Sequence, residues 1–187
     1  MGRFDNSQWV GNIWEQRSER VWEMQNWSYQ KAPPQVDRLQ RVDYYVSPTE
    51  GINWGVDVKA PKRNGPEGCL LLEFRSVSGG KGWLYGAANY IMQWVSPDEY
   101  LVYRPSAIRK RFNGWWDNLE VERGDTSVTN QVDKFVGRSG KSRYGTTNQD
   151  VFMWVPYERV LGWSGGNLIN VKTLKDRVDN KKAHHIM

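Results

Sequence analysis

Two acidic residues near the middle of the chain are each followed, two positions later, by a basic residue. Asp57 precedes Lys59 and Glu73 precedes Arg75, and both pairs lie in apolar segments that favour extended structure. In a strand, residues i and i+2 project from the same face, so each acid shares a face with its base. If the two segments pair as an antiparallel hairpin, two acids and two bases meet on one surface. That combination suits a divalent cation bound beside a phosphate.

The surrounding sequence predicts the strands that must position these residues. β-forming residues and turn residues place the strands at 41–47, 52–60 and 69–77. In a three-stranded meander of these segments, Asp43, Asp57 and Glu73 line up across neighbouring strands. Glu73 follows three leucines, so we expect it to be partly buried. The alternative is that all three are exposed strand charges that pair across the sheet.

The remaining elements predict an α/β fold. Apolar residues at three- and four-residue spacings predict an amphipathic helix over 7–30, which Pro33 and Pro34 end. Residues 87–95 are apolar and fit either a helix or a strand. Further elements are expected at 100–103 (strand), 106–112 (helix), 151–155 (strand) and 156–161 (helix).

Charge and aromatic content point to an anionic partner. The chain of 187 residues carries a net charge of +5, and its sequence pI is about 9.3. Such a balance favours nucleic acid first, although many basic proteins bind none. Eleven tryptophans can stack on unpaired bases or can fill a core or an interface.

Basic residues in three glycine- or proline-containing segments are candidates for gripping a nucleic-acid backbone. They are Lys62, Arg63, Lys81, Lys134, Arg138, Lys141 and Arg143. The last four lie in a polar stretch, 117–150, that we interpret as a basic loop or insertion. A solvated surface loop without a partner is the competing interpretation.

Several classes of protein are disfavoured. No run of about 18 apolar residues occurs, so no membrane span is expected, and the first residues lack an apolar signal core. We therefore expect a cytoplasmic protein. One internal cysteine, Cys69, and two histidines near the end, His184 and His185, cannot form a zinc site of the usual spacing. A single domain with a charged, fraying tail from residue 172 is expected.

Three strings of residues carry a resemblance to a known family. They are Val56–Arg63, Leu72–Val77 and Gly82–Gly86. With the helix before them, they resemble the PD-(D/E)XK nuclease superfamily, and more narrowly its small uncharacterised members from phages and bacteria. The resemblance covers roughly residues 40 to 105. It implies a restriction-endonuclease-like core, in which a mixed central sheet is flanked by helices.

The same resemblance implies a metal-dependent DNA endonuclease or a resolvase-like phosphodiesterase, with Mg²⁺ or Mn²⁺ as cofactor. The expected metal ligands are Asp43, Asp57 and Glu73, and the expected catalytic set is Asp57, Lys59, Glu73 and Arg75. The first helix can add Glu15 or Glu19 as a further carboxylate, or these acids can form surface salt bridges. For a phage-encoded chain, the location would be the host cytoplasm.

One departure from the superfamily pattern leaves the mechanism open. The usual Glu-x-Lys stands here as Glu73-Phe74-Arg75, and arginine binds phosphate but cannot act as a general base. Either Arg75 or Lys59 takes the cationic role; or the working set is Asp43 with Asp57 and Lys59, Glu73 being accessory; or the site is degenerate and the protein only binds DNA. We favour the first two interpretations together.

Two rival functions make different predictions. A non-catalytic DNA-binding protein on the same fold would bind DNA with a steep salt dependence and would release no products. A phage factor that binds a host protein through tryptophan-rich surfaces would show no salt-sensitive DNA binding. The sequence does not decide whether the chain forms a homodimer.

Overall fold

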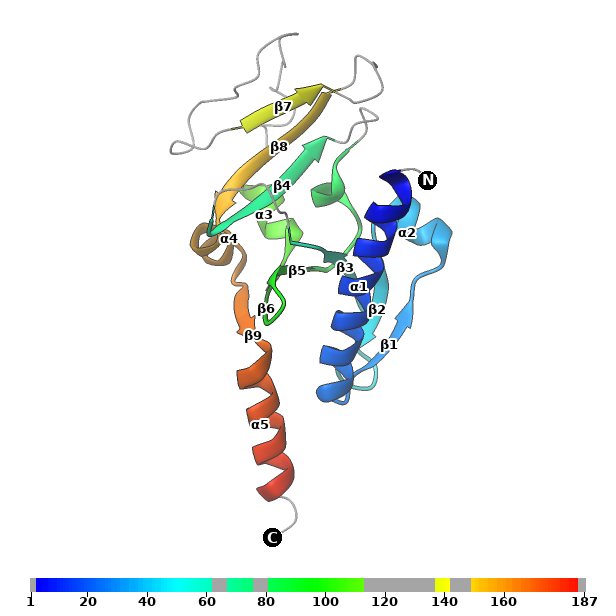
Figure 1. The fold of residues 1–187 in the computed structure, drawn as a ribbon, viewed down its shortest axis with the longest axis vertical. Helices are drawn as coiled ribbons and strands as arrows, with labels where there is room; N and C mark the ends of the chain where they lie inside the picture. Colours follow the sequence, from blue (N-terminus) through cyan, green and yellow to red (C-terminus); the bar gives the residue numbers. More distant parts are fainter. Residues whose placement is uncertain (1–2, 62–66, 76–80, 113–136, 142–148, 185–187) are drawn as a thin grey trace. The chain divides into compact units, whose positions relative to one another are not determined.

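The computed structural model describes residues 3–61, 67–75, 81–112, 137–141 and 149–184. The chain forms two compact units that are built from interleaved segments (Figure 1). The first unit comprises 1–61, 87–104 and 166–187, and the second comprises 62–86 and 105–165. Because neither unit is one continuous stretch of chain, the expectation of a single domain stays a prediction.

A six-stranded mixed sheet forms the first unit. Its order is β1-β2-β3-β5-β6-β9, with β3 and β5 parallel and every other neighbouring pair antiparallel. The strands are β1 (Ser28–Lys31), β2 (Tyr44–Ser47), β3 (Trp54–Lys59), β5 (Tyr90–Ser96), β6 (Glu99–Tyr103) and β9 (Asn167–Asn170). Among the described residues the chain also has five α-helices, so the predicted α/β class with a mixed sheet is confirmed.

Helix α1 (Arg3–Met24) packs on one face of this sheet. Val21 and Trp22 of the helix enter a core with Tyr44, Val56 and Trp94 from the strands. The alternation along β3 explains the contact, because Trp54, Val56 and Val58 all project toward the helix. Helix α2 (Pro34–Gln40) and helix α5 (Val171–His184) complete the unit.

The parallel pairing of β3 with β5 overturns the predicted three-stranded meander. Parallel neighbours need a crossover connection, and residues 60–89 provide it. Strand β4 (Cys69–Arg75) lies within this crossover and pairs with β8, in a different sheet from β3. The β2–β3 hairpin exists as predicted, whereas the expected β3–β4 hairpin does not.

The second unit contains a three-stranded antiparallel sheet of order β4-β8-β7. Besides β4, the sheet contains β7 (Gly137–Lys141) and β8 (Gln149–Pro156). The unit also contains helices α3 (Pro105–Arg111) and α4 (Tyr157–Ser164) and the 3-10 helix η1 (Trp83–Tyr85). An aromatic core holds the unit together: the Phe112 ring lies 5.2 Å from that of Phe74 and 5.6 Å from that of Trp163.

Several elements differ from the sequence expectations. The ambiguous segment 87–95 is mostly strand β5, and the residues from 172 belong to helix α5 rather than to a frayed tail. Strand β7 lies within the stretch predicted as a loop. The predicted end of the first helix at Pro33 and Pro34 is wrong, because α1 ends at Met24 and strand β1 follows it. The prolines begin α2 instead: Pro34 occupies its first turn, where its missing N–H costs nothing.

A close backbone contact at Gly82 gives a test of the second unit. The Gly82 N–H donates to the carbonyl of Phe74 at 2.8 Å, and a Cβ added there would overlap the carbonyl of Glu73. We predict that Gly82→Ala lowers the free energy of unfolding by about 1–3 kcal/mol in urea denaturation. Gly162→Ala is the matched control, because its Cβ would meet nothing within 4 Å and alanine favours a helix. Equal stability of the two variants would contradict the contact.

Candidate active site

The predicted acid Asp57 lies on the face of β3 that is turned away from helix α1. Its side chain is only 1% exposed, and its neighbours in the sheet on that face include Ile91, Gln93 and Tyr103, which are all buried. A carboxylate placed so deeply costs several kcal/mol unless partners compensate. The partners of Asp57 therefore define what this site can do.

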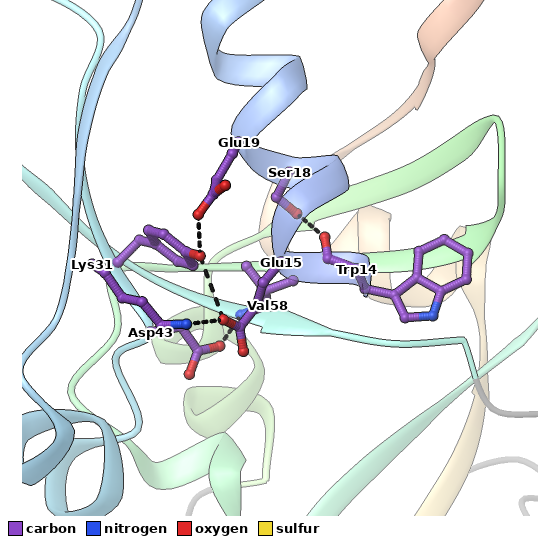
Figure 2. A network of polar contacts seen from close by, with 8 residues as sticks. Trp14, Glu15, Ser18, Glu19, Lys31, Asp43 and Val58 are labelled. Carbon is purple, nitrogen blue, oxygen red and sulfur yellow. Dashed lines mark hydrogen bonds and ion pairs between the residues drawn. The ribbon is translucent and has the colours of Figure 1, made fainter. Parts of the chain in front are cut away.

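Asp43 meets β3 through both its backbone and its carboxylate. Its N–H donates to the carbonyl of Val56 at 2.9 Å, and its Oδ2 accepts from the N–H of Val58 at 2.7 Å (Figure 2). The carboxylate thus replaces a ladder carbonyl at the point just before β2 begins. This double attachment fixes the Asp43 carboxyl group beside the residues that flank Val58 in sequence, Asp57 and Lys59.

The two oxygens of Asp57 differ in their surroundings. Oδ1 accepts from Lys59 Nζ at 2.5 Å, which forms an ion pair with an ammonium group whose side chain is 27% exposed. Oδ2 is buried and accepts from no N–H or hydroxyl donor of the described residues, while the Asp57 carboxyl group shares a hydrogen bond with Asp43 when the pair holds a proton. A buried acceptor left unpaired costs about 1–3 kcal/mol, so native structures rarely retain one without a reason such as an ion.

Electrostatics couple the two carboxyl groups. The pKa of Asp43 is raised to about 8, first by burial and then by the charge of Asp57, while Lys59 and the Val58 N–H act in the opposite direction. Burial raises the pKa of Asp57 as well, against the lowering effects of Lys59 and of a hydrogen bond with the Asp43 carboxyl group. Two carboxyl groups in such a position cannot both ionise freely, so the pair retains a proton near neutral pH.

Two buried polar residues lie next to this pair. Gln93 stands opposite Lys59 in the parallel β3–β5 register, and its Oε1 accepts from the Tyr103 hydroxyl at 2.9 Å. The pKa of Tyr103 is raised by burial and also by the charge of Asp57. Tyr103 therefore stays a neutral hydroxyl that holds the Gln93 side chain in one orientation.

Acids of helix α1 bind basic and phenolic groups of the sheet. Lys31 Nζ lies 2.6 Å from Glu15 Oε2, and the Tyr44 hydroxyl donates to Glu19 at 2.6 Å (Figure 2). The hydrogen bond that Lys31 donates to Glu15 raises the pKa of Lys31, and the charge of Asp43 raises it further. Glu15 thus forms one of the salt bridges that the sequence allowed, and Lys31 places a second cation within electrostatic range of Asp43.

The structure brings together three of the sequence-predicted site residues, namely Asp43, Asp57 and Lys59. Glu73 and Arg75 lie on β4 in the second unit, where they stand opposite Phe152 and Val151 of β8. Because the three-stranded meander does not form, the predicted alignment of Glu73 with the other two acids on adjacent strands is wrong. Its role as a metal ligand stays a prediction.

The predicted basic contacts that the structure describes, Lys81, Arg138 and Lys141, belong to the second unit. Lys81 is exposed, with its Nζ 6.0 Å from the centre of the Tyr85 ring. Arg138 and Lys141 lie in β7. The candidates that fall outside the described residues are Lys62, Arg63, Lys134 and Arg143.

The donor set of the site fits a hard divalent cation. Among the described residues no group of three Asp, Glu, His or Cys side chains could hold a metal ion. Mg²⁺, however, is commonly bound through one or two carboxylates and keeps several waters. The Asp43 and Asp57 carboxyls provide that pair, and the unpartnered Oδ2 of Asp57 provides an acceptor with unused capacity.

Sequence reasoning missed Gln93, Tyr103 and Lys31 as members of this site. Gln93 carried a usable signal, because it interrupts the apolar run of 91–95 where a buried strand needs a reason for a polar residue. The other two carried none, since their relation to Asp57 and Asp43 depends on strand pairings far apart in sequence.

No family model, no curated protein and no solved structure matches the chain. Within the ranges that the structure describes, no helix has both the length and the apolar character to cross a membrane.

The raised pKa of Asp43 predicts how stability depends on pH. Between the unfolded pKa near 4 and the folded pKa of about 8, the native state binds more protons, so stability falls as pH rises through that window. Asn at position 43 keeps an acceptor for the Val58 N–H but does not titrate. In urea denaturation with EDTA, we predict that wild type loses more stability than Asp43→Asn between pH 5 and pH 9.

The control for that comparison is Glu50→Gln, which changes an exposed carboxyl group of the same unit that does not act on the pKa of Asp43. This variant should lose as much stability between pH 5 and pH 9 as wild type does. If wild type and Asp43→Asn lose stability in parallel, the Asp43 carboxyl does not retain a proton in the folded protein.

Proposed function

We propose that the chain is a metal-dependent phosphodiesterase that cuts DNA, with Asp43 and Asp57 as its metal ligands. The observation that supports this best is the buried Oδ2 of Asp57, which has no hydrogen-bond partner among the described residues and lies beside an ammonium group. Near neutral pH a proton shared with Asp43 can satisfy this oxygen, but once that proton is lost the ion pair with Lys59 leaves a completely buried carboxylate only half satisfied. A bound cation would compensate its charge.

Each residue of the site has a distinct part in this proposal. When bound, the metal ion would supply Lewis-acid stabilisation and a more acidic water. Asp43 holds one oxygen on the Val58 N–H, and loss of the proton that it shares with Asp57 makes a further carboxylate oxygen available to a ligand. Lys59 carries a cation next to the acids and is partly exposed, so its Nζ can contact an incoming phosphate.

This arrangement favours the interpretation in which Asp43 acts with the intact Asp57-x-Lys59 pattern. All three residues belong to one unit, and Lys59 can take the role for which Arg75 is poorly suited. Glu73 remains an accessory ligand in the proposal. A restriction-endonuclease-like core, in the manner of PD-(D/E)XK nucleases, is also part of the proposal. It rests on the sequence resemblance, because the β3–β5 crossover stands where a meander was expected.

DNA is the proposed substrate because of charge. The net charge of +5 and the basic residues predicted as backbone contacts favour a polyanion. Lys81, a member of that set, is exposed. Duplex, branched and single-stranded DNA are all compatible with these features. A homodimer and a cytoplasmic location also belong to the proposal.

Metal binding can be tested without any assay of cleavage. A ligand that binds only the folded state stabilises it by about 2.7 kcal/mol at 100 times its Kd. We predict that Mn²⁺ raises the Tm of wild type in differential scanning fluorimetry, and more at pH 8.5 than at pH 6, because the metal must displace the shared proton. Asp57→Asn should abolish the shift, whereas the exposed-turn variant Glu50→Gln should keep it.

Cleavage is tested with labelled duplex, branched and single-stranded DNA, with and without Mn²⁺. Wild type should release products only with metal. Asp43→Asn and Asp57→Asn should lower the rate by about 100-fold or more, which corresponds to losing a few kcal/mol of transition-state stabilisation. Salt-sensitive retardation of DNA without products in any condition would instead establish the non-catalytic DNA-binding alternative.

A further inference from the structure

An aromatic cavity lies in the first unit, between the end of helix α1 and five strands of the six-stranded sheet. Its volume is about 240 Å³. An engineered apolar cavity of about 150 Å³ binds benzene, so this one has room for a fused second ring. The cavity is therefore large enough to hold a bicyclic planar group.

The walls suit a flat aromatic ligand. Five of the lining residues are aromatic, and Trp27, Trp54 and Tyr90 among them are only half-buried, which places ring surface near the opening. The rings of Trp54 and Tyr90 lie 5.0 Å apart, and those of Trp27 and Trp54 lie 6.1 Å apart at nearly a right angle. Ring faces held at such angles by a core can stack on a base without reorganising.

Two amide side chains interrupt the apolar lining. The Nε2 of Gln25 donates to the carbonyl of Val21 at 3.4 Å, and its Oε1 has no partner among the described residues. The Asn167 side chain has no hydrogen bond to any described residue. An amide that offers both a donor and an acceptor matches the edge of a purine, which presents ring nitrogens and an exocyclic group.

A cation lies beside one wall of the cavity. The exposed Arg104 donates from Nε and Nη2 to the Tyr90 hydroxyl at 3.3 and 3.2 Å, and its guanidinium carbon lies 5.5 Å from the centre of the ring. This arrangement fixes a positive charge next to an aromatic face. A nucleotide whose base enters the cavity would bring its phosphate toward the positive charge of Arg104.

From these features we infer that the cavity binds a purine base, with Arg104 contacting the attached phosphate. The site is distinct from the proposed active site, because Val56 lines the cavity while Asp57, the next residue of β3, projects from the opposite face of the sheet. The purine comes either from a free nucleotide or from an unpaired base of a strand, and both carry the same chemistry.

Isothermal titration calorimetry of the full chain in EDTA tests this inference. The probes are dAMP, dGMP, dCMP, deoxyadenosine, indole and a single-stranded oligonucleotide. Purine nucleotides should bind more tightly than dCMP, which leaves part of the cavity unfilled, and more tightly than indole, which lacks acceptors. An oligonucleotide that binds while free nucleotides do not identifies the strand as the source, and the reverse identifies the nucleotide.

Variants separate the contributions of the amides and of the cation. Gln25→Leu and Asn167→Leu should each weaken purine binding about 5- to 10-fold, as the loss of a hydrogen bond predicts, while Gln30→Leu on exposed β1 should not. Arg104→Gln should weaken dAMP but not deoxyadenosine. Arg111→Gln is its matched control, because Arg111 also lies over an aromatic ring, that of Trp163 in the second unit.

A filling variant keeps the inference falsifiable if other variants misfold. Val102→Phe narrows the cavity from the sheet side and should abolish purine binding, whereas Asp57→Asn should leave it unchanged. The inference is overturned if no purine compound binds, if indole binds as tightly as the purines, or if Val102→Phe binds normally. Loss of purine binding in Asp57→Asn would also overturn it, since the ligand would then occupy the proposed active site.

Discussion

The burial of one carboxylate, Asp57, is the constraint on which the site depends. It stands on a central strand with one oxygen bound to Lys59 and the other unpaired among the described residues. Removing such a group from water is unfavourable, and one ion pair with a partly exposed lysine offsets only part of the cost. The neighbouring Asp43 adds a second acid rather than a compensating cation, and burial together with the charge of Asp57 raises the pKa of Asp43 to about 8. Two acids with one lysine beside them favour the binding of a further positive charge.

The sheet explains how such an unfavourable group is held. Asp43 is fixed by its N–H on Val56 and by its carboxylate on Val58, so β2 and β3 must pair in one register before the two acids can meet. The other face of β3 packs against helix α1, which leaves Asp57 no alternative orientation. The same alternation along β3 separates the acidic centre from the aromatic cavity. One strand thus supports two chemically different sites.

Local patterns were sufficient to predict the first helix, the β2–β3 hairpin and the convergence of Asp43, Asp57 and Lys59, because each depends on periodicity or on neighbouring strands. The position of β4 was not predictable in this way. Its apolar run gave the strand, but nothing in Cys69–Arg75 distinguishes pairing with β3 from pairing with β8, about 80 residues later. Gln93 joins the site only through the parallel β3–β5 crossover, which local sequence does not encode. The function itself, and the role of Glu73, stay predictions.

The most direct test of the account is a crystal structure of the protein soaked in Mn²⁺, with anomalous differences recorded near the manganese edge. The account predicts a peak within about 2.0–2.5 Å of Asp57 Oδ2 and of a carboxylate oxygen of Asp43, with waters in the remaining positions. A well-ordered site without a peak, with Asp57 bound only to Lys59 at a pH above 8, would contradict it.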